Sequence, residues 1–141
     1  MTTVAFRDGV VAYDSRITAE GLIRDDAAEK CTLRNGVRFF FLGATADNER
    51  FMALYFGGSD DFKDIGCSAV VVDGEKLLLV AVAHETGMWR QPQRKDRYFS
   101  EGSGSDHAIT AMDMGATAKE AVKWASKRDS CTGGRIRTFK L

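Results

Sequence analysis

The feature that most constrains the fold of this chain is a set of three Asx–Gly pairs, each lying between two short runs of β-prone residues. The pairs are Asp8-Gly9, Asn35-Gly36 and Asp73-Gly74. Asparagine, aspartate and glycine tolerate the positive φ angles that two-residue hairpin turns require. Each pair therefore predicts a β-hairpin. The hairpins would join residues 3–6 to 10–13, residues 31–33 to 37–42, and residues 67–72 to 76–82.

Three other segments have helical periodicity. Apolar residues recur at helical spacing over residues 46–55, where Gly57-Gly58 ends the pattern, and again over residues 108–112. The third segment begins at Thr117, which forms a capping box with Glu120. The remaining pattern predicts short strands at 22–23, 98–99 and 136–139, and a loop over the polar stretch 84–97. Because strands and helices are segregated rather than strictly alternating, the sequence predicts an α+β layered domain.

The size and charge of the chain limit what it can be. With 141 residues, of which 44% are hydrophobic, the chain is long enough for a core of its own, and we expect one domain over residues 1–141. The longest apolar runs, 69–72 and 77–83, are much shorter than the ~20 residues of a membrane span. Twenty basic and twenty acidic residues cancel. We therefore expect neither nucleic acid nor a membrane as a partner.

The cysteines and the N-terminal residues indicate the cellular compartment in which the protein is expected. Cys31, Cys67 and Cys131 are an odd number without a C-x-x-C pair, which argues against a disulfide framework or a structural zinc site. The first residues lack the charged and apolar regions of a signal peptide. We therefore expect a cytoplasmic protein. Because metal-ligand spacings are absent and the glycine-rich segment 102–105 lacks the lysine of a phosphate-binding loop, we expect no metal and no cofactor.

Few residues could act as a catalytic nucleophile. His84 and His107 are the only histidines, and no G-x-S-x-G motif accompanies them. Thr2 differs, because removal of Met1 would give it a free α-amine beside its hydroxyl group. A threonine that uses its own amine as the base is a known nucleophile arrangement. Many proteins begin with Met-Thr for other reasons, so this pattern is weak by itself.

Five segments occur in an order that resembles proteasome β-subunits and the bacterial HslV peptidase, which are N-terminal nucleophile hydrolases. The segments are Thr2-Thr3-Val4 with residues 8–18, then Glu29-Lys30-Cys31, residues 41–47, Gly102-Ser103-Gly104-Ser105, and residues 128–134. Together they span almost the whole chain. The resemblance implies a four-layer αββα sandwich. Its first helical layer would be reduced here, because only one helix fits between Asp47 and Gly57.

The resemblance also implies a mechanism, that of a threonine-type endopeptidase. Thr2 would attack a peptide carbonyl and form an acyl-enzyme, while its α-amine takes the hydroxyl proton. A model α-amine has a pKa of about 7.7–8.0, and the cation of Lys30, paired with Asp14, would lower it. The backbone N–H of Gly43 would face the developing oxyanion. The amine and a water molecule would be held by Ser103, Asp129 and Thr132. With Met1 attached, the amine is one residue too far away and the site would be silent.

Substrate-binding residues follow from the same resemblance. Arg16 would pair with the carboxylates of neighbouring loops, and Thr18 would offer its backbone to an extended peptide. The S1 pocket, which takes the side chain before the scissile bond, would be lined by Ile17, Ala28, Phe41 and Thr45. Because Phe41 would partly fill this pocket, we expect small or medium apolar side chains there.

The resemblance implies partners as well. We expect a peptide or an unfolded protein as substrate and a homo-oligomer as the assembly, with a ring as one form. The chain is shorter than typical members of the family, and its reduced helical layer argues against docking of an ATP-driven unfoldase. Two alternatives stay open at this point. One is a catalytically silent assembly or binding protein with the proteasome fold, and the other is a non-peptide amidase on that fold.

Overall fold

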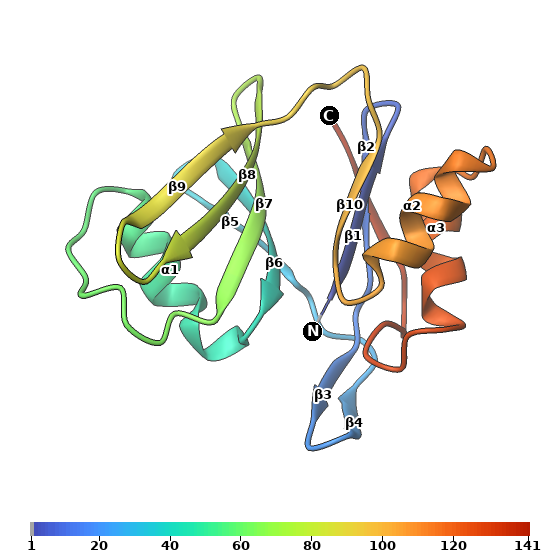
Figure 1. The fold of residues 1–141 in the computed structure, drawn as a ribbon, viewed down its shortest axis with the longest axis horizontal. Helices are drawn as coiled ribbons and strands as arrows, with labels where there is room; N and C mark the ends of the chain where they lie inside the picture. Colours follow the sequence, from blue (N-terminus) through green and yellow to red (C-terminus); the bar gives the residue numbers. More distant parts are fainter. Residues whose placement is uncertain (1) are drawn as a thin grey trace. The chain divides into compact units, whose positions relative to one another are not determined.

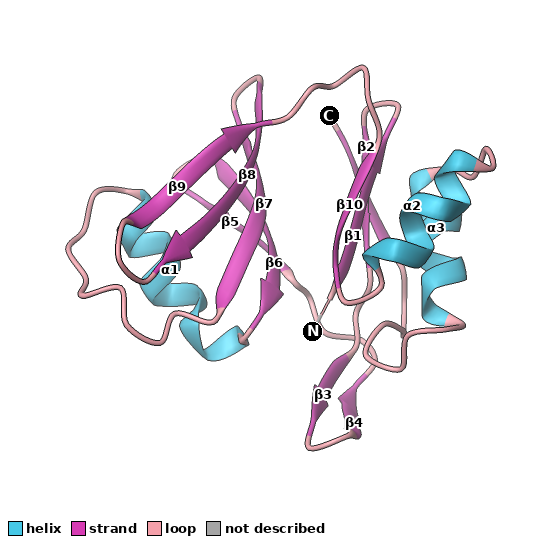
Figure 2. Cartoon of the chain, in the orientation of Figure 1, coloured by secondary structure: helices cyan, strands magenta, loops and turns pink. Residues whose placement is uncertain are grey.

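The computed structural model describes residues 2–141, and Met1 lies outside the described residues. These residues form strands β1 to β11 in three antiparallel sheets, three α-helices and one short 3-10 turn (Figures 1 and 2). The chain divides into two compact units. The first unit comprises Met1–Lys30 and Arg94–Leu141, and the second comprises Cys31–Gln93.

The first unit is built on a four-stranded sheet with the strand order β10-β1-β2-β11. Its strands are β1 (Thr3–Arg7), β2 (Val10–Tyr13), β10 (Phe99–Gly102) and β11 (Arg137–Lys140). The helices α2 (Ser105–Asp113) and α3 (Ala118–Ser126) pack against this sheet (Figure 1). Small residues on both sides allow close packing. The buried contact is formed by Ala5, Ala12, Ala108, Met112, Ala118, Ala121, Val122 and Ala125.

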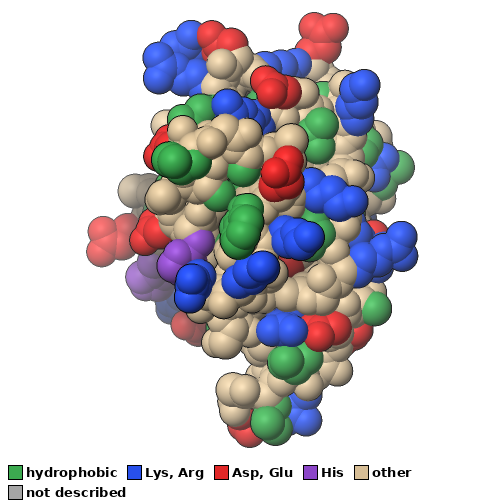
Figure 3. Space-filling model, turned by 90° about the vertical axis from the view of Figure 1, so that its right-hand side faces the viewer, with side chains coloured by type: hydrophobic (Ala, Val, Ile, Leu, Met, Phe, Trp, Pro, Cys, Tyr) green, Lys and Arg blue, Asp and Glu red, His purple; other side chains and the backbone are tan. Residues whose placement is uncertain are grey.

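Helix α3 is amphipathic and begins as the sequence predicts. The Thr117 hydroxyl accepts a hydrogen bond from the backbone N–H of Glu120 at 3.1 Å, which confirms the predicted N-terminal cap. Helix α3 carries the exposed lysines Lys119 and Lys123, and the exposed Lys127 directly follows its last residue. Seen from the side of α2 and α3, Lys and Arg side chains spread across the surface with Asp and Glu among them (Figure 3).

A small hairpin also belongs to the first unit. Strands β3 (Ile17–Ala19) and β4 (Leu22–Asp25) pair only with each other. All four residues of β4 are exposed, Leu22 and Ile23 among them. This hairpin connects the strand that carries the candidate site to the segment that contains Lys30.

The second unit contains a five-stranded antiparallel sheet with the strand order β5-β6-β7-β8-β9. Its elements are β5 (Cys31–Arg34), β6 (Val37–Gly43), the 3-10 turn η1 (Thr45–Asp47), α1 (Asn48–Tyr55), β7 (Cys67–Asp73), β8 (Lys76–Ala83) and β9 (Gly87–Pro92). Helix α1 buries Phe51 and Met52 against inward side chains of β6, β7 and β8. The ring of Phe51 lies edge-on to those of Phe39 and Phe41, at centroid distances of 6.4 and 5.7 Å.

The three predicted hairpins are confirmed. Asp8 and Asn35 have φ angles of 51° and 50°, and the glycine that follows each has a φ angle of 77°, as two-residue turns require. The third hairpin turns one residue later than predicted, because Asp73 pairs with Lys76 inside the ladder. The turn residues there are Gly74 and Glu75.

The prediction of a layered α+β domain with a four-layer αββα sandwich is wrong. The described residues form a small, β-rich fold of three antiparallel sheets, and the α-helices have only eight or nine residues each. Glycines near their ends limit α1 and α2, while long runs of β-branched and aromatic residues form strands. The loop predicted over residues 84–97 is also partly wrong. It contains β9, an edge strand whose polar residues face solvent and whose Pro92 stands at the strand end, where no backbone donor is needed.

Among residues 2–141, no helix has the length and apolar character needed to cross a membrane.

Candidate active site

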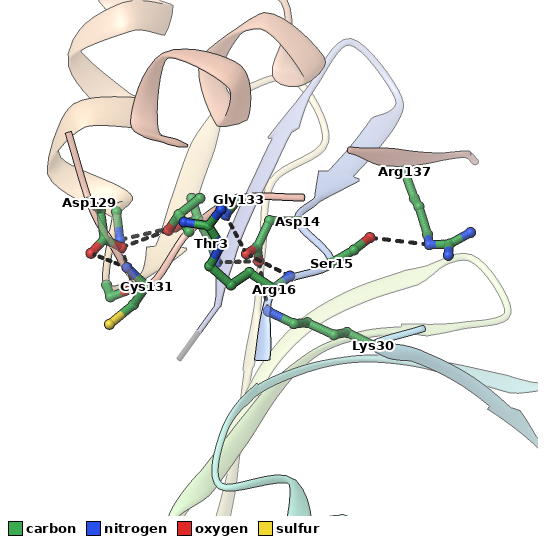
Figure 4. A network of polar contacts seen from close by, with 12 residues as sticks. Thr3, Asp14, Ser15, Arg16, Lys30, Asp129, Cys131, Gly133 and Arg137 are labelled. Atoms are coloured by element: carbon green, nitrogen blue, oxygen red, sulfur yellow. Dashed lines mark hydrogen bonds and ion pairs between the residues drawn. The ribbon is translucent and has the colours of Figure 1, made fainter. Parts of the chain in front are cut away.

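The centre of the candidate site is the carboxylate of Asp14, which follows strand β2 in the first unit. Its side chain is fully buried. One oxygen, Oδ1, accepts hydrogen bonds from the backbone N–H of Thr3 at 3.1 Å and from Lys30 Nζ at 3.0 Å. The other, Oδ2, accepts from the backbone N–H groups of Gly133 at 3.0 Å and Arg16 at 3.3 Å (Figure 4). Asp14 therefore joins the start of β1, the loop before β11 and the lysine (Figure 4).

Lys30 is buried and ion-paired. Its side chain is 8% exposed, and Figure 4 shows it reaching toward Asp14. Burial lowers the pKa of Lys30 below its ordinary value, while the charge and the hydrogen bond of Asp14 act in the opposite direction. Since Lys30 Nζ and the Thr3 N–H contact the same carboxylate oxygen, the lysine lies close to the backbone nitrogen that follows Thr2.

A second carboxylate, Asp129, organises the loop between α3 and β11. Asp129 Oδ2 accepts hydrogen bonds from Ser103 Oγ at 2.5 Å and from Thr132 Oγ1 at 2.6 Å, and Oδ1 accepts one from the backbone N–H of Cys131 at 3.1 Å. Burial acts to raise the pKa of Asp129, but these hydrogen bonds outweigh it and hold the pKa below its ordinary value. Asp129 is thus held as a carboxylate between two hydroxyl groups.

Thr2 lies beside this second cluster. The residue is 4% exposed, and its carbonyl oxygen accepts a hydrogen bond from the backbone N–H of Ser103 at 3.1 Å. Strand β1 pairs with β10 from Thr3↔Gly102 onward, so sheet pairing fixes Thr2 next to Ser103. The expected removal of Met1 concerns a residue outside the described part of the chain.

Arg16 stabilises the loop that carries Asp129. Its guanidinium group forms a two-point ion pair with Asp26, at 2.8 and 3.1 Å, and donates a hydrogen bond to the Ser130 carbonyl at 3.1 Å. The hydrogen bond to Asp26 raises the pKa of Arg16. Arg16 therefore links the segment after β4 to the 129–133 loop.

The other predicted substrate-binding residues of the first unit lie near the β3–β4 hairpin. Ile17 and Thr18 are half-buried on β3, and Thr18 pairs with Ile23. Ala28 donates its backbone N–H to the Ser15 carbonyl at 3.1 Å. Their predicted roles toward a substrate stay predictions.

The remaining predicted residues belong to the second unit. Gly43 ends β6 with a φ angle of +90°, and a Cβ there would lie 2.3 Å from the Gly66 carbonyl oxygen, so only glycine fits. Phe41 is buried among the aromatic rings of that unit, 4% exposed, and Thr45 is exposed in η1. The roles of Gly43 in an oxyanion site and of Phe41 and Thr45 in a pocket stay predictions.

Thr3, Gly104 and Gly133 take part in the network but were not predicted as site residues from the sequence. Thr3 contributes its backbone N–H to Asp14 and its hydroxyl to Thr132. Gly104 donates its backbone N–H to Thr3 Oγ1, and Gly133 donates its own to Asp14. In the sequence, Thr3 is one threonine of a Thr-Thr pair at the start of a strand. Only the register of β1 against β10 shows where its side chain points.

The arrangement offers groups that nucleophilic and acid–base chemistry can use. It combines a buried ammonium group, two oriented carboxylates and several hydroxyl groups around the start of β1. Among the described residues, no group of three or more His, Cys, Asp or Glu side chains is placed to hold a metal ion.

The chain is similar to two solved structures of BPH from Thiobacillus denitrificans. One is of BPH, with a TM-score of 0.71, 18% identity, and coverage of 99% of this chain and 96% of that chain. The other is of BPH in complex with epoxomicin, with a TM-score of 0.70, 18% identity, and coverage of 99% and 97%. At this identity the likeness shows a shared fold. No family model matches the chain, and no curated protein matches it.

Proposed function

We propose that this protein is a threonine-type N-terminal nucleophile hydrolase that cleaves peptide bonds through an acyl-enzyme on Thr2, after Met1 has been removed. The observation that carries the proposal is the buried Asp14 carboxylate, which binds the Lys30 ammonium and the Thr3 N–H with one oxygen. This contact ties a cation to the backbone one residue from the proposed nucleophile. The resemblance to proteasome β-subunits and HslV belongs to the same proposal.

In the first half of the reaction, Thr2 Oγ1 attacks the carbonyl carbon of the substrate. The hydroxyl proton passes to the α-amine of Thr2, directly or through a water molecule. As the C–N bond breaks, the same proton is given to the leaving amine, and an ester remains on Thr2. Lys30 supports this step because its positive charge disfavours a second cation nearby and so lowers the pKa of the α-amine.

In the second half, water cleaves the ester. The α-amine accepts a proton from the attacking water, the C–O bond of the ester breaks, and the proton returns to Thr2 Oγ1. Ser103 fits a supporting role in both halves. Its hydroxyl hydrogen is donated to Asp129, so its oxygen keeps lone pairs that can accept a hydrogen bond from the α-amine of Thr2.

The structure of BPH in complex with epoxomicin supports a peptide-like ligand for a protein of this fold. Epoxomicin is a peptide epoxyketone, which has two electrophilic positions. A hydroxyl group can add to the ketone and an amine can open the epoxide. A threonine with a free α-amine supplies both nucleophiles from one residue.

The test is covalent labelling of the methionine-free protein with epoxomicin, followed by intact mass and peptide mapping. We expect one inhibitor per chain, on residue 2. Thr2→Ser should still be labelled because it keeps both nucleophiles, whereas Thr2→Ala should not. Absence of an adduct on folded, methionine-free protein would contradict the proposal. So would an adduct that maps to a cysteine and persists in Thr2→Ala.

A further inference from the structure

The side chain of Thr3 lies in the polar network although the proposed mechanism gives it no role. It is fully buried, and its Oγ1 lies 2.6 Å from Thr132 Oγ1. The same oxygen accepts a hydrogen bond from the backbone N–H of Gly104 at 2.9 Å. Residues more than 100 positions apart in the chain therefore meet at this one hydroxyl group.

The direction of each hydrogen bond follows from counting hydrogens. A carboxylate can only accept hydrogen bonds, so Thr132 Oγ1 must donate its single hydrogen to Asp129 Oδ2. In the contact between the two threonines, Thr3 must then be the donor. One of the two lone pairs of Thr3 Oγ1 accepts a hydrogen bond from the Gly104 N–H. The chain of donors therefore runs from Gly104 through Thr3 and Thr132 to Asp129.

We propose that Thr3 is a positioning residue of the active site. By donating to Thr132, its hydroxyl holds Asp129 and Ser103 in the orientation in which the Ser103 oxygen serves the α-amine of Thr2. This inference rests on the proposed function, because Ser103 has such a role only in a hydrolase of this kind. Thr3 does not touch the substrate and acts through the side chains that follow it in the network.

The proposed role of Thr3 rests on the free energy that is lost when a buried chain of hydrogen bonds ending on a charged group is broken. Replacing Thr3 with valine keeps the shape of the side chain but removes the hydroxyl group. The Gly104 N–H then loses its acceptor, and the Thr132 hydroxyl loses the donor that orients it. Thr132 and Asp129 can then rotate, so the defect falls on the chemical step rather than on substrate binding.

The kinetic test compares Thr3→Val and Thr3→Ser with a matched control, Thr138→Val, which makes the same change at an exposed position of the same sheet. For peptide hydrolysis or epoxomicin labelling, we expect Thr3→Val to lower kcat or the maximal labelling rate by about 10- to 100-fold, with KM changed by less than about threefold. Thr3→Ser should recover most of the rate. Equal rates in Thr3→Val and wild type, or no rescue by serine, would overturn the proposal.

A second measurement does not depend on activity. Carboxyl NMR titration should find the pKa of Asp129 higher in Thr3→Val than in wild type, and unchanged in Thr138→Val. An unchanged Asp129 pKa overturns the positioning role, even in an active enzyme. A raised pKa in a protein that epoxomicin never labels instead means that the hydrolase proposal has failed. Should Thr3→Val not fold, Thr3→Cys replaces it, because a thiol is a weak donor.

Discussion

Replacing Lys30 with methionine is expected to lower the rate of Thr2 acylation by about 5- to 10-fold at neutral pH. Without the ammonium group, the α-amine of Thr2 returns toward its ordinary pKa and is largely protonated. At pH 7 only about a tenth of it is then unprotonated and able to accept the hydroxyl proton, and this fraction sets the expected loss of rate. The variant also leaves the buried Asp14 carboxylate without its ion-pair partner. We therefore expect it to lose about 3–5 kcal/mol in the free energy of unfolding.

The measurement is the rate of epoxomicin labelling as a function of pH, for protein shown to be folded by circular dichroism. Lys76→Met is the matched control, because Lys76 is exposed at the start of β8 in the second unit. The control should label at the wild-type rate. The labelling rate of Lys30→Met should partly recover as the pH rises, since the amine then loses its proton without help. A folded Lys30→Met protein that labels within about threefold of wild type at neutral pH would refute the role of the lysine.

Replacing Gly104 with alanine is expected to destabilise the first unit by about 3 kcal/mol. A Cβ at this position would lie 2.5 Å from Thr3 Oγ1, and 3.0 Å from both Ala125 Cβ and Thr132 Oγ1. These atoms belong to the buried side of α3 and to the hydrogen-bond network around Thr3, so they cannot all move away. Overpacking of a well-packed site costs about 1–3 kcal/mol, and the disturbed buried hydrogen bonds add to that cost.

Urea unfolding of Gly104→Ala and of a control, Gly66→Ala, measures this effect. Gly66 has ordinary neighbour distances for a Cβ, 3.5 Å to Ala44 Cβ and 3.6 Å to Asp47 Oδ2. The control should stay within about 1 kcal/mol of wild type, because nothing has to shift. A Gly104→Ala protein as stable as the control would mean that the network around Thr3 is loosely packed.

Local features of this fold can be predicted from the sequence because short-range physics determines them. The turns at Asp8 and Asn35 require residues that tolerate a positive φ, and the sequence provides such residues there. The cap at Thr117 depends on a hydroxyl and a backbone N–H three residues apart. In each case the interacting groups lie within a few positions of each other.

The layering of the fold could not be predicted in the same way. Helical periodicity over a few residues does not tell how many layers a chain can build, and the short helices found here do not form the expected sandwich. Strand β9 was missed because its partner β8 supplies the pairing that its own polar sequence does not indicate.

The candidate site could also be predicted only in part, because some of its residues belong to local motifs and others depend on distant contacts. Asp14, Lys30 and Asp129 were named through a resemblance of local motifs, and the structure then provides their distances. Thr3 and Gly104 could not be found, because their role depends on strand register and on a contact between residues 101 positions apart. A threonine at the start of a strand gives no local signal of that contact.

The most direct measurement of the central claim is the pKa of the Thr2 α-amine in methionine-free protein, followed by NMR with ¹⁵N-labelled threonine. The account predicts a pKa clearly below the ~7.7–8.0 of an ordinary α-amine, and a rise toward that range in Lys30→Met. A wild-type amine that titrates at or above about 8.0 would contradict the account, since the lysine would then do nothing to prepare the base.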